Sequence, residues 1–129
     1  MGRQIISTEH APAAVGPYSQ GVRVGRFLFT AGQIPLDPES GKMVVGDVAA
    51  QTHQVMRNLR AILESAGISF DDVVKTTVFL QDMDHFAQMN GVYGQFFEGE
   101  PPARSTVQVS GLPLGAMVEI EAIAHVPPD

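Results

Sequence analysis

The stretch that decides the fold is "DVAAQTHQVMRNLRAILESAGISFDDVVKTTVFLQD", residues 47–82. Its first part carries apolar residues at helical spacing, starting after Asp47, a good N-cap, and stopping before Gly67, where a glycine commonly ends a helix. This pattern predicts a helix over residues 47–66. The second part is a short β-branched run that is apolar at both sets of alternating positions. It predicts a strand over residues 73–81 in the middle of a sheet.

Short strand-like runs stand on both sides of this unit. Upstream, "GVRVG" and "FLFTAGQIP" are separated by Gly25 and Arg26, and this arrangement predicts a β-hairpin. The cluster "LDPESGK" then predicts a turn. Downstream, two strands are expected at about 104–110 and 117–126. The loop "GLPLGA" between them is short, so we expect these two strands to pair.

A second helix is predicted from about Asp84 to Phe97, because aromatic residues and methionine form one stripe along it. Gly91 and Gly94 fall inside this helix, where each costs about 1 kcal/mol of helix propensity. We therefore expect the helix to approach a sheet or another helix closely at these glycines.

The expected order of elements is β-β-α-β-α-β-β, an α+β fold with both helices on one face of the sheet. The other face of the sheet then lacks a cover from the same chain. A partner subunit is the expected cover, and the low share of charged residues, 17%, favours an oligomer in the same way.

The bulk properties limit the classes of function. With 129 residues, the chain is expected to form a single domain over residues 1–129. A formal net charge of −6 opposes binding to nucleic acid, because phosphates are also negative. The sequence also has no Lys/Arg cluster that could contact phosphates. The absence of cysteine excludes thiolate nucleophiles and Cys-ligated zinc. Without a signal peptide or a membrane-length apolar run, we expect a soluble protein of the cytoplasm.

Arg104 and the two glutamates of "VEIEA" are the strongest candidates for chemistry. Arg104 is the only Lys or Arg after Lys75, and it follows two prolines at the start of a strand. Alternation places Glu119 and Glu121 on one strand face. One reading is structural: Arg104 forms a salt bridge with Glu119 or Glu121, and the two glutamates lie on a solvated face of their strand. The other is functional: the guanidinium binds a small carboxylate while a nearby glutamate binds a water and moves its proton.

Other chemistry-bearing residues are less informative. The four histidines show no metal-ligand spacing, so no metal site is expected. The stretch "GPYSQG", residues 16–21, does not have the spacing of a nucleophile elbow. It is either a turn alone or a turn that projects Tyr18 or Ser19 into a site.

Taken together, "GPYSQG", "TAGQIPLDPESG", "VVKTTVFLQD" and "PPARSTVQVSGLPLGAMVEIEA" closely resemble the Rid family of reactive-intermediate deaminases, the RidA/YjgF type. The resemblance covers essentially the whole chain. It implies a fold like chorismate mutase and a homotrimer with clefts between subunits. It also implies hydrolysis of reactive enamines and imines such as 2-aminoacrylate to 2-keto acids and ammonia, with no cofactor.

The resemblance also implies roles for particular residues. Arg104 would bind the substrate carboxylate, Glu119 would orient or deprotonate the attacking water, and Tyr18 would help to position that water. The remaining implied site residues contribute backbone or lie at the cleft; they are Ala31, Gly32, Thr106 and Asn90.

Two positions depart from many relatives of the deaminating type: Ala31 stands where they have Ser, and Thr106 where they often have Cys. Because Ala31 removes a hydroxyl from the site, two alternatives stay open. One is a protein that binds or senses 2-keto acids without turnover. The other is an endoribonuclease or translation inhibitor, which the negative charge disfavours. A chaperone-like role is neither supported nor excluded by the sequence.

Overall fold

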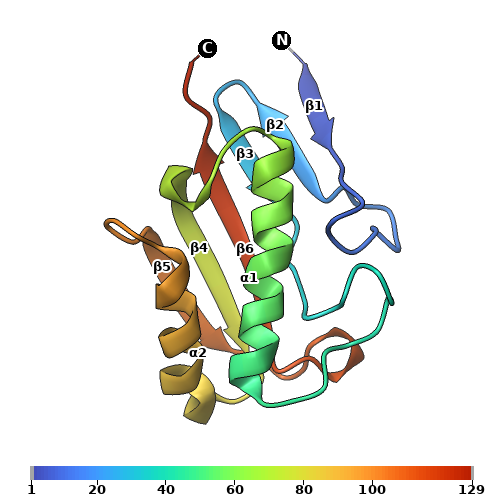
Figure 1. Ribbon diagram of the computed structural model, residues 1–129, viewed down its shortest axis with the longest axis vertical. Coiled ribbons are helices and arrows are strands. Elements are labelled where there is room, and N and C mark those ends of the chain that lie inside the picture. Colours follow the sequence, from blue (N-terminus) through green and yellow to red (C-terminus); the bar gives the residue numbers. More distant parts are fainter. Residues whose placement is uncertain (1, 129) are drawn as a thin grey trace.

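The computed structural model describes residues 2–128, which form a six-stranded mixed sheet with two α-helices on one face (Figure 1). The strands are β1 (Arg3–Ile6), β2 (Gly21–Val24), β3 (Phe27–Thr30), β4 (Val73–Leu80), β5 (Ala103–Gln108) and β6 (Val118–His125). The α-helices are α1 (Val48–Ser65) and α2 (Phe86–Tyr93), and the 3₁₀ turns are η1 (Phe70–Asp72), η2 (Met83–His85), η3 (Gly94–Phe96) and η4 (Pro113–Gly115). The predicted α+β class with both helices on one face is confirmed. No helix within residues 2–128 has the length and apolarity needed to cross a membrane.

The predicted first helix is confirmed almost to the residue, and so is its N-cap. The Asp47 carboxylate accepts a hydrogen bond from the Ala50 amide at 2.9 Å, which satisfies one of the free N–H groups of the first turn. Gly67 adopts φ +76° just after the helix ends, a conformation that glycine reaches without strain. The apolar stripe of α1, including Val55, Leu59 and Ile62, is fully buried against the sheet.

The strand order is β1-β2-β3-β6-β4-β5, which contradicts the expected pairing of the last two strands. β5 lies at the edge and pairs in parallel with β4, while β6 lies between β3 and β4 and is antiparallel to both. Burial explains the difference. β6 turns four apolar side chains into the core, whereas most of β5 is exposed, as suits an edge strand.

The N-terminal part of the sheet holds one confirmed prediction and one strand that was not predicted. β2 and β3 form the expected hairpin, and Gly25 in its turn adopts φ +59°. β1 was missed because "RQII" has only two apolar residues in sequence. It pairs with β2 and buries Ile6 beside Gly21, where a β-carbon would lie 3.3 Å from Ile6.

The second helix is shorter than predicted, since only residues 86–93 are α-helical and 3₁₀ turns flank them on both sides. The expected close approach at Gly91 and Gly94 is wrong. A β-carbon built at either position would have no atom within 4 Å. Both glycines face open space, so they are not required by packing within this chain.

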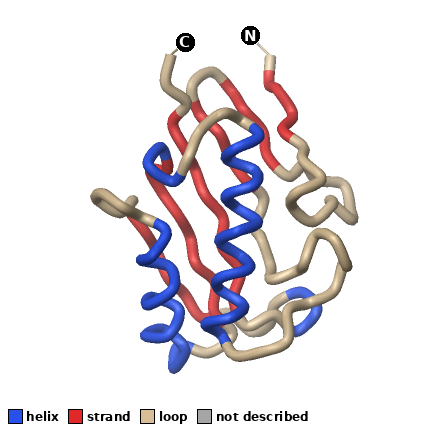
Figure 2. The backbone as a smooth tube through the Cα atoms, in the orientation of Figure 1, coloured by secondary structure: helices blue, strands red, loops and turns tan. Residues whose placement is uncertain are grey.

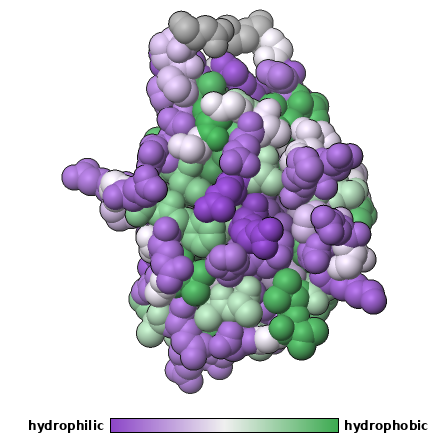
Figure 3. Space-filling model, viewed as in Figure 1, coloured by the Kyte–Doolittle hydropathy of each residue, from purple (hydrophilic) through white to green (hydrophobic). Residues whose placement is uncertain are grey.

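The two faces of the sheet differ in their surroundings. Hydrophilic side chains gather over α1 on the helix-bearing side (Figure 3). On the opposite face the sheet leaves apolar side chains half exposed; these are Ile5, Val24, Phe27, Phe29 and Val107, at 43–50% exposure. No element of residues 2–128 covers them, in agreement with the predicted uncovered face of the sheet.

Candidate active site

The seven residues singled out from the sequence fall into two separate groups. The first, called here the glutamate pocket, contains Tyr18, Ala31, Gly32 and Glu119. The second, called here the arginine cluster, is built on β5 and α2 around Arg104, and Thr106 and Asn90 belong to it. The two groups have different environments.

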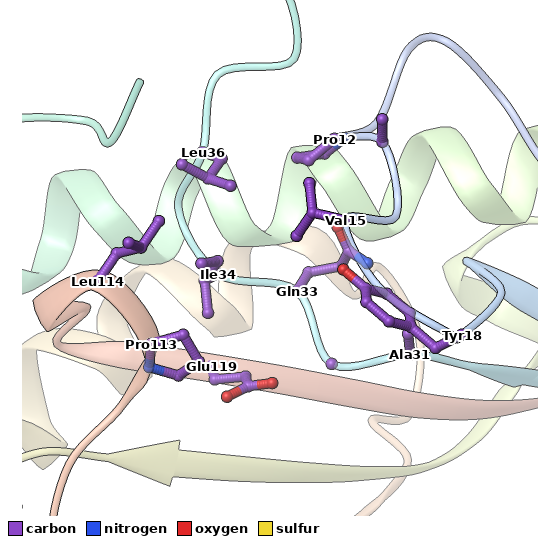
Figure 4. Close-up of a pocket in the computed structure, with 12 residues that line it drawn as sticks. Pro12, Val15, Tyr18, Ala31, Gln33, Ile34, Leu36, Pro113, Leu114 and Glu119 are labelled. Atoms are coloured by element: carbon purple, nitrogen blue, oxygen red, sulfur yellow. The ribbon is translucent and has the colours of Figure 1, made fainter. Parts of the chain in front are cut away.

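The glutamate pocket is a cavity of about 570 Å³ lined by residues of the 7–20 and 31–47 loops, the η4 turn and β6. Figure 2 shows the backbones of these two loops side by side, to the right of α1. The polar side chains of the pocket come from Tyr18, Gln33 and Glu119 (Figure 4). Its remaining walls are small or apolar and consist of Pro12, Ala13, Val15, Ala31, Gly32, Ile34, Leu36, Pro113 and Leu114. An apolar pocket with a few polar groups is the usual form of a small-molecule site.

Glu119 leaves β6 on the face opposite the buried Ile120 and lies directly against Gly32. A β-carbon at position 32 would collide with the Glu119 carboxylate, with Cδ at 2.9 Å and Cγ at 3.1 Å. The glycine is therefore required by close approach rather than by its backbone angles. Burial, and secondarily the charge of Glu121, raises the pKa of Glu119 above its usual value. A carboxylate with a raised pKa is a better base near neutral pH.

Backbone and side-chain hydrogen bonds hold the loops of the glutamate pocket in place. The Gln33 amide donates to the Ile120 carbonyl at 2.8 Å, and the Ile120 amide donates to the Gln33 carbonyl at 3.1 Å, so Gly32 is held beside β6. The nearly buried Gln20 side chain accepts from the Thr8 amide at 2.7 Å and donates to the Pro12 carbonyl at 2.8 Å. Gln20 thus positions the loop that carries Tyr18. The sequence reasoning missed it, because only the folded chain shows what a single glutamine contacts.

In the arginine cluster, the guanidinium of Arg104 packs on two aromatic rings of α2. Its Cζ lies 4.9 Å from the centre of the Tyr93 ring and 5.4 Å from that of Phe86. The Tyr93 hydroxyl shares a hydrogen bond of 2.7 Å with the buried Thr76 hydroxyl. Burial raises the pKa of Tyr93, so the phenol stays neutral, although Thr76 and Arg104 act in the opposite direction. These contacts stack the planar guanidinium, and within residues 2–128 it forms no salt bridge with a carboxylate.

Two further predicted residues share this surface and have unused polar atoms. The side-chain oxygens Asn90 Oδ1 and Thr106 Oγ1 are buried and have no hydrogen-bond partner within the described part of the chain. Asn90 lies one helical turn from Phe86 and from Tyr93, and Thr106 lies two residues beyond Arg104 on the same strand face. Buried polar atoms without partners are rare, and they are expected where a ligand binds.

The expectation that Arg104 lies beside Glu119 within one chain is wrong. β4 separates the two strands, and Arg104 pairs across to Thr76 while Glu119 pairs across to Phe79. Arg104 faces the helices and Glu119 faces the other side of the sheet. A salt bridge between Arg104 and Glu119 or Glu121 within one chain is excluded for the same reason. The two groups belong to one site only if copies of the chain are combined.

Other residues considered from the sequence lie outside these two groups. Ser19 lines a second cavity of about 440 Å³, beside Tyr18 and the start of the chain. No group of three or more His, Cys, Asp or Glu side chains in residues 2–128 has an arrangement that could hold a metal ion.

Comparison with known proteins places these features in context. A family model described as Endoribonuclease L-PSP matches residues 8–126. The chain is 54% identical to a RutC family protein of Pyrococcus horikoshii, with 95% of this chain and 98% of that protein covered. It is 52% identical to the 2-iminobutanoate/2-iminopropanoate deaminase of Mus musculus, with 95% and 90% covered. The solved structure of TdcF from E. coli with bound serine has a TM-score of 0.92 and 46% identity and covers 96% of this chain and 99% of its own.

Proposed function

Because the chain belongs to the YjgF/RidA family, we propose that it hydrolyses reactive imines and enamines of amino-acid origin to 2-keto acids and ammonia. The observation that carries the proposal is the pair of incomplete half-sites. One holds a cation that has no carboxylate partner within residues 2–128, together with unpaired polar atoms, and the other holds a carboxylate with a raised pKa in a pocket. Mouse and rat relatives at about 50% identity bear the name of such a deaminase.

In this reaction the protein mainly has to hold the substrate and the attacking water in the correct relative position. The Arg104 fork binds the substrate carboxylate, and Asn90 and Thr106 offer further hydrogen-bond groups there. An enamine first takes a proton at its terminal carbon and becomes an iminium, whose central carbon is electrophilic. Water bound by Glu119 and Tyr18 attacks this carbon while Glu119 accepts a proton. The proton then passes to nitrogen, the C–N bond breaks and ammonia leaves. The C=O bond forms as the added hydroxyl gives its proton to Glu119 or to solvent, which balances the proton taken up by the enamine.

The site is assembled between copies in this proposal, as a homotrimer with three equivalent clefts. Arg104 of one copy would face Glu119 of the next, which resolves their separation within one chain. The half-exposed apolar side chains on the open face of the sheet support such an assembly, because a neighbouring copy would remove them from water.

The first experiment is a coupled assay in which a serine dehydratase generates 2-aminoacrylate and release of ammonia and pyruvate is followed. Addition of the protein should accelerate release, and Arg104→Ala should remove that acceleration. Arg104→Lys keeps the charge but loses the two-pronged geometry, so an intermediate rate is expected. An Arg104→Ala protein with full activity would end the proposal.

The second experiment tests whether the site lies between copies. Arg104→Ala and Glu119→Gln chains, each inactive alone, are mixed, unfolded and refolded together. With random mixing, about one quarter of the clefts receive an intact arginine from one chain and an intact glutamate from another, so about one quarter of the activity should return. No recovery, in the presence of mixed oligomers shown by mass spectrometry, would contradict a shared site.

Two other functions make different predictions. A protein that only binds 2-keto acids would show heat of binding with 2-ketobutyrate and no deamination. An endoribonuclease, the activity named in the matching family model, would cleave RNA in a nuclease-free preparation and lose this with Arg104→Ala. The net charge of −6 weighs against the latter.

A further inference from the structure

Arg104 needs a fixed position if it is to bind a carboxylate with two donors at once. An arginine side chain is long and flexible, and ordering it costs conformational entropy. Within residues 2–128 no carboxylate forms a salt bridge with Arg104, so no ion pair holds the guanidinium there. It is held instead by two rings of α2, with its Cζ 5.4 Å from the centre of Phe86 and 4.9 Å from that of Tyr93.

The two rings are themselves held in different ways. Tyr93 is 4% exposed, and its hydroxyl shares a hydrogen bond of 2.7 Å with the hydroxyl of the buried Thr76. Burial raises the pKa of the phenol, so it stays neutral and keeps this bond at neutral pH. Phe86 is partly exposed, begins α2 and has no polar side-chain atom. Of the two rings, only Tyr93 can therefore tie the stacked guanidinium to the sheet by a hydrogen bond.

Thr76 lies directly beside Arg104 in the sheet. The two residues are cross-strand partners in the parallel β4–β5 pair, and both side chains lie on the helix-bearing face. The hydrogen bond from Thr76 to Tyr93 thus joins three elements around the guanidinium, since β5 carries Arg104, β4 carries Thr76 and α2 carries Tyr93. A displacement of α2 from the sheet would leave two buried hydroxyls without partners, which is costly.

We propose that Tyr93 is a positioning residue of the reaction, and that its hydrogen bond to Thr76 fixes the ring on which Arg104 receives the substrate carboxylate. The inference rests on the proposed function. The substrate carboxylate keeps its charge from binding to the transition state, so its bonds to Arg104 are equally strong in both. Loss of the hydrogen bond to Thr76 should therefore weaken substrate binding and leave the chemical step unchanged.

The test compares Tyr93→Phe with the wild type. Phenylalanine keeps the ring and its contact with Phe97, whose centre lies 4.9 Å away, and lacks only the hydroxyl. Calorimetry with 2-ketobutyrate should give a Kd about three- to tenfold higher for the variant. The KM for the imine that an amino-acid oxidase makes from 2-aminobutyrate should rise by the same factor, while kcat stays within about twofold of the wild type.

The mobility of Arg104 can be measured directly. Nuclear spin relaxation of its Nε–H group should show an ordered side chain in the wild type and a more mobile one in Tyr93→Phe. Arg60 is the internal reference. Its Cζ also lies 4.9 Å from a ring centre, that of Phe96, and this ring has no hydroxyl to lose. The mobility of Arg60 should be the same in both proteins.

Further variants separate positioning from a loss of stability. Thr52→Val removes another buried hydroxyl with a hydrogen bond of 2.7 Å, in α1, and its Kd should equal that of the wild type. The double variant Tyr93→Phe, Thr76→Val leaves neither hydroxyl unpaired, so part of the lost stability should return while Kd stays high. Thr76→Ser keeps a hydroxyl at this position and should retain the Kd of the wild type.

The outcomes distinguish this inference from the proposed function. If Kd is the same in Tyr93→Phe and the wild type, or recovers with stability in the double variant, the inference is overturned and the deaminase proposal is untouched. A lower kcat with an unchanged KM, or a wild type that binds no 2-ketobutyrate, also overturns the inference. If no imine is hydrolysed but Tyr93→Phe binds 2-ketobutyrate more weakly, the deaminase proposal fails and the positioning role of Tyr93 stands.

Discussion

Replacing Gly32 with alanine tests whether the position of Glu119 matters for the reaction. The added β-carbon would occupy the space of the Glu119 carboxylate, 2.9 Å from Cδ and 3.1 Å from Cγ. The backbone at Gly32 does not have a positive φ, so alanine itself fits there. The flexible glutamate side chain must rotate away, and an off-rotamer side chain costs only about 0.5–1.5 kcal/mol. The free energy of unfolding should therefore fall by no more than this.

Activity should respond far more than stability. A positioned general base contributes roughly 10²–10⁴-fold to rate, and a carboxylate moved from its water loses most of that. We expect kcat in the coupled 2-aminoacrylate assay to fall by about 10²-fold or more, together with a urea unfolding curve close to that of the wild type.

Gly94→Ala is the matched control for the glycine substitution. A β-carbon at Gly94 has no atom within 4 Å, and this residue has helical backbone angles. Activity should be unchanged and the free energy of unfolding should rise by up to about 1 kcal/mol. If Gly32→Ala retained full kcat, Glu119 would not be the group that handles the water.

Three further predictions concern Glu119, its neighbour and the support of Arg104. Because the folded chain raises the pKa of Glu119, it binds that proton more tightly than the unfolded chain, so stability falls as pH rises from the ordinary carboxyl pKa toward the raised one. Glu119→Gln should thus raise Tm at pH 7 and not at about pH 3.5, and an equal rise at both values would contradict the assignment. Glu121→Gln removes the repulsion that helps to raise the Glu119 pKa, so the acid limb of the pH–rate profile should move to lower pH; a shift to higher pH would refute this. Tyr93→Phe leaves the buried Thr76 hydroxyl without its partner and should cost about 1–3 kcal/mol by urea unfolding. Adding Thr76→Val should recover part of that loss, and strictly additive losses would show that the two hydroxyls do not interact.

The first helix and the hairpin could be predicted from the sequence, because helix capping and hydrophobic periodicity depend on residues that are close together in the chain. The N-cap and the apolar stripe of the helix after Asp47 are both formed by residues of one continuous segment. The alternation of apolar residues in the last strand predicts that Glu119 faces away from the core, and the two flanking strand-like runs predict the hairpin at Gly25. β1 was not predicted, since only one of its two apolar residues, Ile6, is buried, and that burial depends on the pairing with β2.

The position of each strand in the sheet could not be read in the same way. A short loop suggested that the strands of Arg104 and Glu119 pair, but pairing is decided by competition for the core. β6 carries the larger apolar face and takes the central place, which sends β5 to the edge and puts β4 between them. The buried oxygens without partners and the close approach of Glu119 to Gly32 are likewise products of long-range packing.

The sequence by itself therefore predicted the candidate residues for chemistry and determined most of the local elements that bear them, because residue type and short-range periodicity depend only on neighbours along the chain. Only the tertiary structure decided that the cation and the carboxylate lie on opposite faces of one sheet. Burial of apolar area is a property of the whole fold, and it arranges strands without regard to the length of the loop between them.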